Sequence, residues 1–136
     1  DANLAKAVMT INAVKSVSIG NADDLLELKG SEARDEITST GYSTNNSGGI
    51  LGGISNGDDI NLSFIIKPTS SIRKKGKTIN NKGKDVDLEV IGRHDPCVGI
   101  RAVPIAEAMV SLVLVDHLLI NRAQCLDIEQ KLPFSE

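Results

Sequence analysis

The chain has 136 residues, of which 40% are hydrophobic, and it carries a formal net charge of -3 at pH 7. This size and apolar content suffice for one domain, predicted over residues 1–136, that needs neither disulfides nor structural metal. With two Phe, one Tyr and no Trp, the composition argues against stacking platforms for single-stranded nucleic acid, and the acidic balance argues against general attraction to nucleic acid or anionic membranes.

A helix and a strand are expected at the start of the chain. Apolar residues at helical spacing, Leu4, Val8 and Ile11, predict an amphipathic helix from residue 3 to about residue 14. It leads into a strand over residues 16–20. Because the sequence opens without Met and as if within a helix, we expect a fragment of a longer protein.

Residues 30–57 are rich in Ser, Thr, Asn and Gly, and they form a longer segment than an ordinary connection requires. It contains two glycine pairs, Gly48–Gly49 and Gly52–Gly53. Glycine lets backbone approach a flat ring or a phosphate closely and permits positive φ angles. The alternative is a tightly turned surface loop without a ligand.

Two strands are predicted farther along, over residues 60–66 and 86–90, because apolar and polar residues alternate in both. We expect them to pair as an antiparallel hairpin with a long loop. That loop begins with Lys67–Ser71, whose ammonium, hydroxyl and backbone N–H groups suit a phosphate. Local composition favours the plainer alternative, in which these side chains and the basic run at residues 73–77 face water.

Arg93, His94 and Asp95 lie between the second strand and a helix predicted from Pro104 to about Arg122. They can act on one ligand, or Arg93 and Asp95 can form a structural ion pair. Since the helix is apolar almost all round, we expect it to lie between sheet layers or in a subunit interface. His117, on this helix, is assigned no catalytic role.

Compartment and metal content are predicted from three features. Cys97 and Cys125 are far apart in the sequence and fit reduced thiols in a cytosolic protein, with no metal site. No signal peptide is recognised at the start. The apolar run at residues 105–115 is too short to cross a bilayer. The protein is therefore expected to be cytoplasmic and not bound to membranes.

Four sequence strings together resemble the carboxy-terminal portion of chorismate synthases. The most specific is Gly-Arg-His-Asp-Pro-Cys-Val-Gly-Ile-Arg-Ala-Val-Pro-Ile-Ala-Glu-Ala-Met, residues 92–109. The others are residues 10–13, the double-glycine stretch at residues 48–55, and Lys-Pro-Thr-Ser-Ser-Ile at residues 67–72. In the family's order, the strings cover the chain from about residue 8 to residue 122.

The resemblance implies an α/β (α+β) fold, a layered β-α-β sandwich with mostly antiparallel strands and buried helices. It also implies a site for reduced FMN, the family's cofactor, and Asp95 as the catalytic residue that manages a proton near the flavin. The positions that match the family's flavin-binding residues are Asn12, Ala13, Gly52, Lys67, Pro68, Thr69, Ser70, Ser71 and Arg93.

The implied reaction is the anti-1,4 elimination of phosphate from 5-enolpyruvylshikimate 3-phosphate, which gives chorismate in the shikimate pathway of aromatic amino acid biosynthesis. The family is further associated with NADP and with homotetramers. The family's amino-terminal half, with its Gly-x-Ser-His motif and substrate-binding arginines, has no match here. We therefore expect the chain alone to be inactive.

Two other functions were weighed. A binding or assembly module would associate through exposed sheet without binding FMN. A nucleic-acid binder would use the basic loop, but the net charge and the scarcity of aromatic residues disfavour it.

Overall fold

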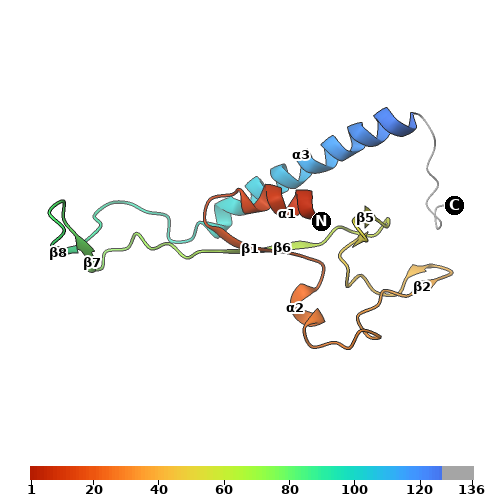
Figure 1. Cartoon of the computed structure of the whole chain (residues 1–136), viewed down its shortest axis with the longest axis horizontal. Coiled ribbons are helices and arrows are strands. Elements are labelled where there is room, and N and C mark those ends of the chain that lie inside the picture. The colour runs from red at the N-terminus through yellow and green to blue at the C-terminus, as the bar shows by residue number, and fades with distance from the viewer. Residues whose placement is uncertain (127–136) are drawn as a thin grey trace.

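The computed structural model describes residues 1–126 and combines three helices with short antiparallel strands, as the predicted α+β class requires (Figure 1). In chain order the elements are α1 (Ala2–Met9), β1 (Val14–Ile19), α2 (Ala22–Leu25), β2 (Ile37–Thr38), β3 (Gly41–Tyr42), β4 (Ile50–Leu51), β5 (Ile54–Ser55), β6 (Leu62–Ile66), β7 (Gly76–Ile79), β8 (Asp85–Leu88) and α3 (Gly99–Cys125).

The core lies where α1 packs between β1 and α3 (Figure 1). Leu4 and Val8, one helical turn apart on α1, are buried, and Val8 has no exposed surface. Small side chains on α3, Ala102 and Ala106, let the two helices approach. Each fully buried Leu or Val contributes roughly 1.5–3 kcal/mol, so this small layer holds the first helix, the first strand and the last helix together.

An antiparallel ribbon of β1 and β6 forms the second layer, with Ile19 opposite Leu62 and Val14 opposite Ile66. The register shifts between Val14 and Ser16, as in a β-bulge. Alternate residues of β6 differ in burial, which confirms the predicted strand with one face on the core. Residues 13 and 67 therefore lie together at one end of the ribbon, and residues 20 and 61 lie together at the other end.

The first helix is shorter than predicted, because it ends at Met9 rather than near residue 14. Thr10 donates its hydroxyl to the carbonyl oxygen of Ala7 at 2.6 Å, and Ala13 adopts a left-handed conformation with φ 70°. Side-chain bonds of this kind compete with helix continuation. The result is a turn that delivers Asn12 and Ala13 to the start of β1.

The predicted pairing of the two later strands is wrong. β6 pairs with β1, whereas β8 pairs with β7, a strand inside the segment that was read as a loop. A tight turn makes this possible, since the side-chain oxygen of Asn80 accepts hydrogen bonds from the backbone N–H groups of Lys82 and Lys84 at 2.9 and 3.0 Å. The β7–β8 hairpin extends away from the core (Figure 1).

Helix α3 begins at Gly99, five residues before the predicted start, so Pro104 lies inside the helix rather than opening it. Within residues 1–126 most of its apolar side chains are exposed and α1 is its main packing partner, so the expected cover between sheet layers is not found there. At 27 residues α3 is also long and apolar enough to cross a membrane, contrary to the length argument from residues 105–115. Core helices of soluble proteins share this property.

The glycine-rich segment forms two small hairpins, β2–β3 and β4–β5, rather than one open loop. Residues 46–48, just before β4, pack against the end of the β1–β6 ribbon at Gly20. An added Cβ on Gly20 would lie 2.1 Å from the carbonyl oxygen of Asn46, and one on Gly48 would lie 2.3 Å from the backbone nitrogen of Gly20. These glycines are required by contact between two backbones, not by a ligand.

Replacing Gly48 by alanine is expected to destabilise the protein by about 2 kcal/mol or more, because the strain of φ 66° adds to backbone overlap. The matched control is Gly52→Ala, where φ is 59° but a Cβ would have nothing within 4 Å, and about 1 kcal/mol is expected. Urea unfolding midpoints compare the two. Equal losses of stability would show that the Gly20–Gly48 contact is unimportant.

Candidate functional site

Two segments predicted to bind an anion meet near the start of α3. The hydroxyl of Thr69 donates to the backbone carbonyl oxygen of Asp95 at 2.9 Å, which joins the Lys67–Ser71 segment to the segment that follows β8. Between them lies a cavity of about 260 Å³. The lining side chains and backbone come from Thr69, Ser71, Ile72, Arg73, Gly92, His94, Asp95 and Pro96.

Asn12 and Ala13 are brought to the same end of the molecule by the ribbon. The backbone N–H of Lys67 donates to the carbonyl oxygen of Ala13 at 2.8 Å, just beyond the last pair of the β1–β6 ladder. Asn12 is exposed and Ala13 half-buried. Three predicted regions, residues 12–13, 67–71 and 93–95, therefore gather around one end of the ribbon.

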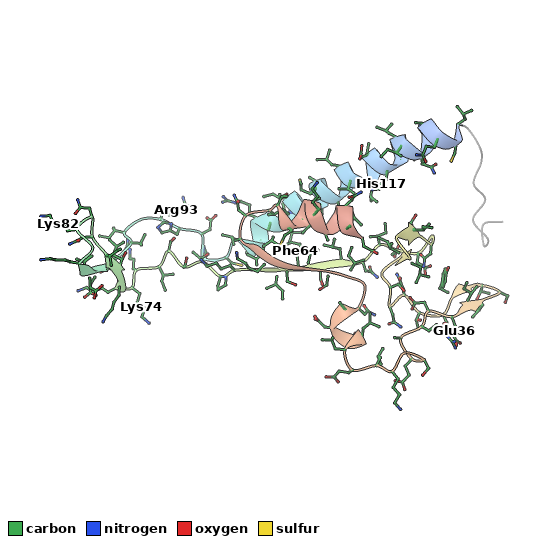
Figure 2. The ribbon with its side chains drawn as sticks, viewed as in Figure 1. Glu36, Phe64, Lys74, Lys82, Arg93 and His117 are labelled. Carbon is green, nitrogen blue, oxygen red and sulfur yellow. The ribbon has the colours of Figure 1, made fainter. Side chains whose placement is uncertain are left out.

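The charges near the cavity are mainly basic. Arg73 lines it together with the imidazole of His94, while Lys67 and Arg93 belong to the two segments that form it. Figure 2 shows Arg93 on the irregular segment between β8 and α3. The carboxylate of Asp95 pairs with Arg101 at 2.9 Å, so the alternative ion pair with Arg93 is wrong. Both partners are exposed to solvent, at 40% and 74%, and such pairs contribute little to stability.

Gly52 does not join this group. It lies in the turn between β4 and β5, beyond the end of the ribbon where Gly20 and Asn61 are bonded, whereas Ala13 and Lys67 lie at the opposite end. A ladder of about six residues is roughly 20 Å long. A Cβ on Gly52 would meet nothing within 4 Å, so this glycine faces open space.

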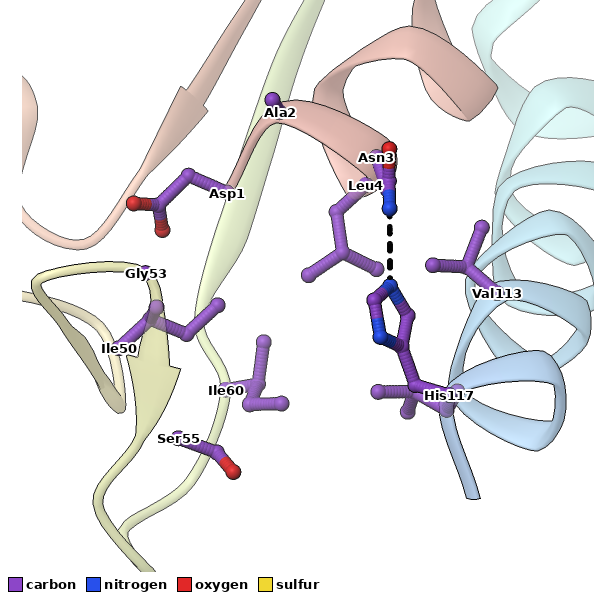
Figure 3. A pocket seen from close by; sticks show the side chains of 11 residues that line it. Asp1, Ala2, Asn3, Leu4, Ile50, Gly53, Ser55, Ile60, Val113 and His117 are labelled. Carbon is purple, nitrogen blue, oxygen red and sulfur yellow. Dashed lines mark hydrogen bonds between the residues drawn. The ribbon is translucent and has the colours of Figure 1, made fainter. Parts of the chain in front are cut away.

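A larger cavity, about 440 Å³, lies between α1, α3 and the β4–β5 hairpin (Figure 3). Its walls are mostly apolar, and a hydrogen bond of 2.9 Å joins Nδ2 of Asn3 to Nε2 of His117 across it. This bond ties α1 to α3, a structural role for His117. Among residues 1–126, no group of three or more His, Cys, Asp or Glu could hold a metal ion.

A comparison with known families identifies the chain. Residues 1–119 match the family model described as chorismate synthase. The chain belongs to the chorismate synthase family. A crystal structure of a chorismate synthase is similar to the chain with a TM-score of 0.63 and 28% sequence identity, over 89% of this chain. The chain covers 30% of the length of that solved chorismate synthase chain.

The donors around the smaller cavity suit a small anionic group. The Ser71 hydroxyl and the Arg73 guanidinium suit a phosphate, which is best bound by charge-assisted hydrogen bonds, whereas the Thr69 hydroxyl already donates to Asp95. The cavity is smaller than the roughly 300–1,000 Å³ typical of sites for whole ligands. It therefore suits a phosphate-sized group better than a complete cofactor.

Sequence reasoning missed three residues that the structure places at notable positions. Arg73 was read as part of a solvated run, yet it lines the cavity four residues after Thr69. Arg101 was not considered, although it supplies the partner of the Asp95 carboxylate. Asp35 was passed over because it lies within residues 30–57 without a recognisable motif, and only the folded chain reveals the donors around it.

Proposed function

We propose that the chain supplies the flavin-binding part of a chorismate synthase, which eliminates phosphate from 5-enolpyruvylshikimate 3-phosphate in an FMN-dependent reaction. One observation carries the proposal beyond family membership. The Lys67–Ser71 segment and the Arg93–Asp95 segment are bonded through Thr69 and enclose a cavity lined by hydroxyl and cationic groups. Such a cavity suits a phosphate-bearing ligand.

Each proposed contact follows from the chemistry of its side chain. Lys67, with the Ser70 and Ser71 hydroxyls, would hold the phosphate of FMN, with Pro68 shaping the segment. Thr69 would contribute through its backbone, because its hydroxyl already donates to the carbonyl oxygen of Asp95. Asn12 would donate to and accept from polar atoms of the ring system, beside the backbone of Ala13. Arg93 would bind an anionic group of the flavin or of the substrate. Gly52 lies at the opposite end of the ribbon, so it would offer open backbone to a flavin bound by another chain of the proposed homotetramer.

When bound, reduced FMN supplies electron density to the substrate during the elimination. The protein's own contribution at this site is a proton acceptor or donor. Asp95 lines the cavity, and its carboxylate pairs with Arg101 at 2.9 Å. We propose that Asp95 holds or moves the proton of the reaction.

The remaining properties follow from the family and the surface of the chain. The proposed protein is a cytoplasmic homotetramer at full length, with no nucleic-acid or membrane partner. The exposed apolar side chains of α3, such as Leu112, Leu118 and Leu119, support burial against further protein. Since the chain spans 30% of the solved relative, we propose that it has no turnover alone.

The same exposed helix favours the second candidate function, an assembly module that does not bind flavin. Anaerobic titration of reduced FMN, combined with size-exclusion chromatography, separates the two. Saturable binding at one FMN per chain supports the flavin site. Association of chains with no FMN binding would leave only the assembly module.

A further inference from the structure

Among the carboxylates of residues 1–126, Asp35 accepts the largest number of hydrogen bonds. One oxygen accepts the backbone N–H of Asn46 at 2.8 Å and the Thr44 hydroxyl at 2.7 Å. The other accepts the backbone N–H of Ser47 at 2.9 Å and the Ser47 hydroxyl. All four donors therefore come from one stretch, residues 44–47.

This stretch forms the base of the double-glycine loop, residues 48–55. The side chain of Asn45 accepts the Gly49 backbone N–H at 2.6 Å and donates to the carbonyl oxygen of Asp59 at 2.9 Å. Gly48 packs against Gly20 at the end of the β1–β6 ribbon. The position of the loop relative to the ribbon is thus set by Asn45 and Gly48, which are direct chain neighbours of the residues bonded to Asp35.

We propose that Asp35 is a positioning residue that fixes the double-glycine loop through residues 44–47, and thereby presents Gly52. The inference rests on the proposed function, in which Gly52 contacts flavin. Asp35 itself reaches neither the loop tip nor the cavity beside Thr69. Its effect on a ligand is indirect.

We call the four hydrogen bonds from residues 44–47 to Asp35 the clamp. The clamp requires an ionised carboxylate, since all four partners are donors. Partial burial raises the pKa of Asp35, but the hydrogen bonds from the hydroxyls of Ser47 and Thr44 and from the backbone N–H groups of Ser47 and Asn46 outweigh it and lower the pKa from 3.8 to about 2. A lowered pKa stabilises the fold above pH ~4, and this stability is lost as the pH falls through about 2.

Asp35→Asn tests the clamp with little change in size. The amide oxygen can accept only one pair of donors, while the new NH₂ faces the other pair. Backbone N–H groups of residues 46 and 47 are expected to exchange with solvent about 10-fold faster in this variant. The control, Glu36→Gln, removes the neighbouring carboxylate, which pairs with Arg34 at the surface, and is expected to leave exchange unchanged.

An NMR titration from pH 5 to about pH 1 gives a second readout. The amide shifts of residues 46 and 47 are expected to titrate with a midpoint of about 2 in the wild-type chain and in Glu36→Gln, but not in Asp35→Asn. Other charged groups near the clamp are Arg34 and Glu36 beside it and Asp58 and Asp59 across the loop. The proposed clamp would be overturned if the amides of residues 46 and 47 exchanged at the wild-type rate in Asp35→Asn. It would also be overturned if their shifts titrated alike in all three chains.

The link to the ligand is tested with reduced FMN. The dissociation constant is expected to rise about fivefold to tenfold in Asp35→Asn and to stay the same in Glu36→Gln. Faster exchange without weaker FMN binding would overturn the positioning role while leaving the flavin site intact. If the wild-type chain binds no FMN, the proposed function fails, and the role in presenting Gly52 to flavin falls with it.

Discussion

Asp95→Asn is expected to reduce turnover of 5-enolpyruvylshikimate 3-phosphate by about 10²- to 10⁴-fold, the usual contribution of a positioned acid or base. The assay uses a chain of full family length that carries residues 1–136 as its carboxy-terminal part. The substitution retains the backbone carbonyl oxygen that accepts the Thr69 hydroxyl, so the two segments stay joined. Only the ability of the side chain to carry a proton is removed, together with its charge.

Arg101→Gln separates these two losses. This variant breaks the ion pair with Asp95 but leaves the carboxylate in place. Because both side chains are exposed, we expect a reduction in turnover of less than about 10-fold. If Arg101→Gln is as damaging as Asp95→Asn, then Asp95 acts through the ion pair and not through its proton.

Lys67→Ala is expected to weaken the binding of reduced FMN by about 10- to 100-fold, since a hydrogen bond to a charged phosphate contributes roughly 1.5–3 kcal/mol. The backbone N–H of Lys67 donates to Ala13, and alanine keeps that bond. The folding of the ribbon should therefore be unaffected. Anaerobic titration of the chain with reduced FMN measures the change.

The matched control for Lys67 is Lys82→Ala. Lys82 lies in the turn of the β7–β8 hairpin, away from the site (Figure 2), and uses its backbone N–H, not its side chain, to bond Asn80. We expect no change in FMN binding. A similar loss in both variants would indicate that FMN responds to total charge, and the proposed phosphate contact at Lys67 would be rejected.

The sequence motifs identified the family because each is a run of consecutive residues that can be recognised without the fold. Residues 92–109 specify chorismate synthases without any knowledge of the fold, and the family model confirms the assignment. Alternation from Leu62 to Ile66 also predicted its strand, because a strand with one face on the core has a period of two. Both predictions needed only neighbouring residues.

Pairing between distant segments was not predictable in this way. Alternation shows that β6 is a strand, but not that β1, over forty residues earlier, is its partner. β7 was missed because Lys77 and Thr78 carry little hydrophobic signal, and their strand is made by the Asn80 turn and by pairing with Val86 and Asp87. The separation of Gly52 from Lys67 likewise follows from the ribbon, not from any local pattern.

The most direct test of the account is anaerobic turnover of 5-enolpyruvylshikimate 3-phosphate with reduced FMN, measured for this chain alone and for a chain of full family length that contains it. We expect chorismate only from the longer chain, because this one covers 30% of the length of the solved relative and is proposed to supply only the flavin-binding part. Chorismate formed by residues 1–136 alone would contradict the division of roles. Failure of both chains would contradict the proposed activity itself.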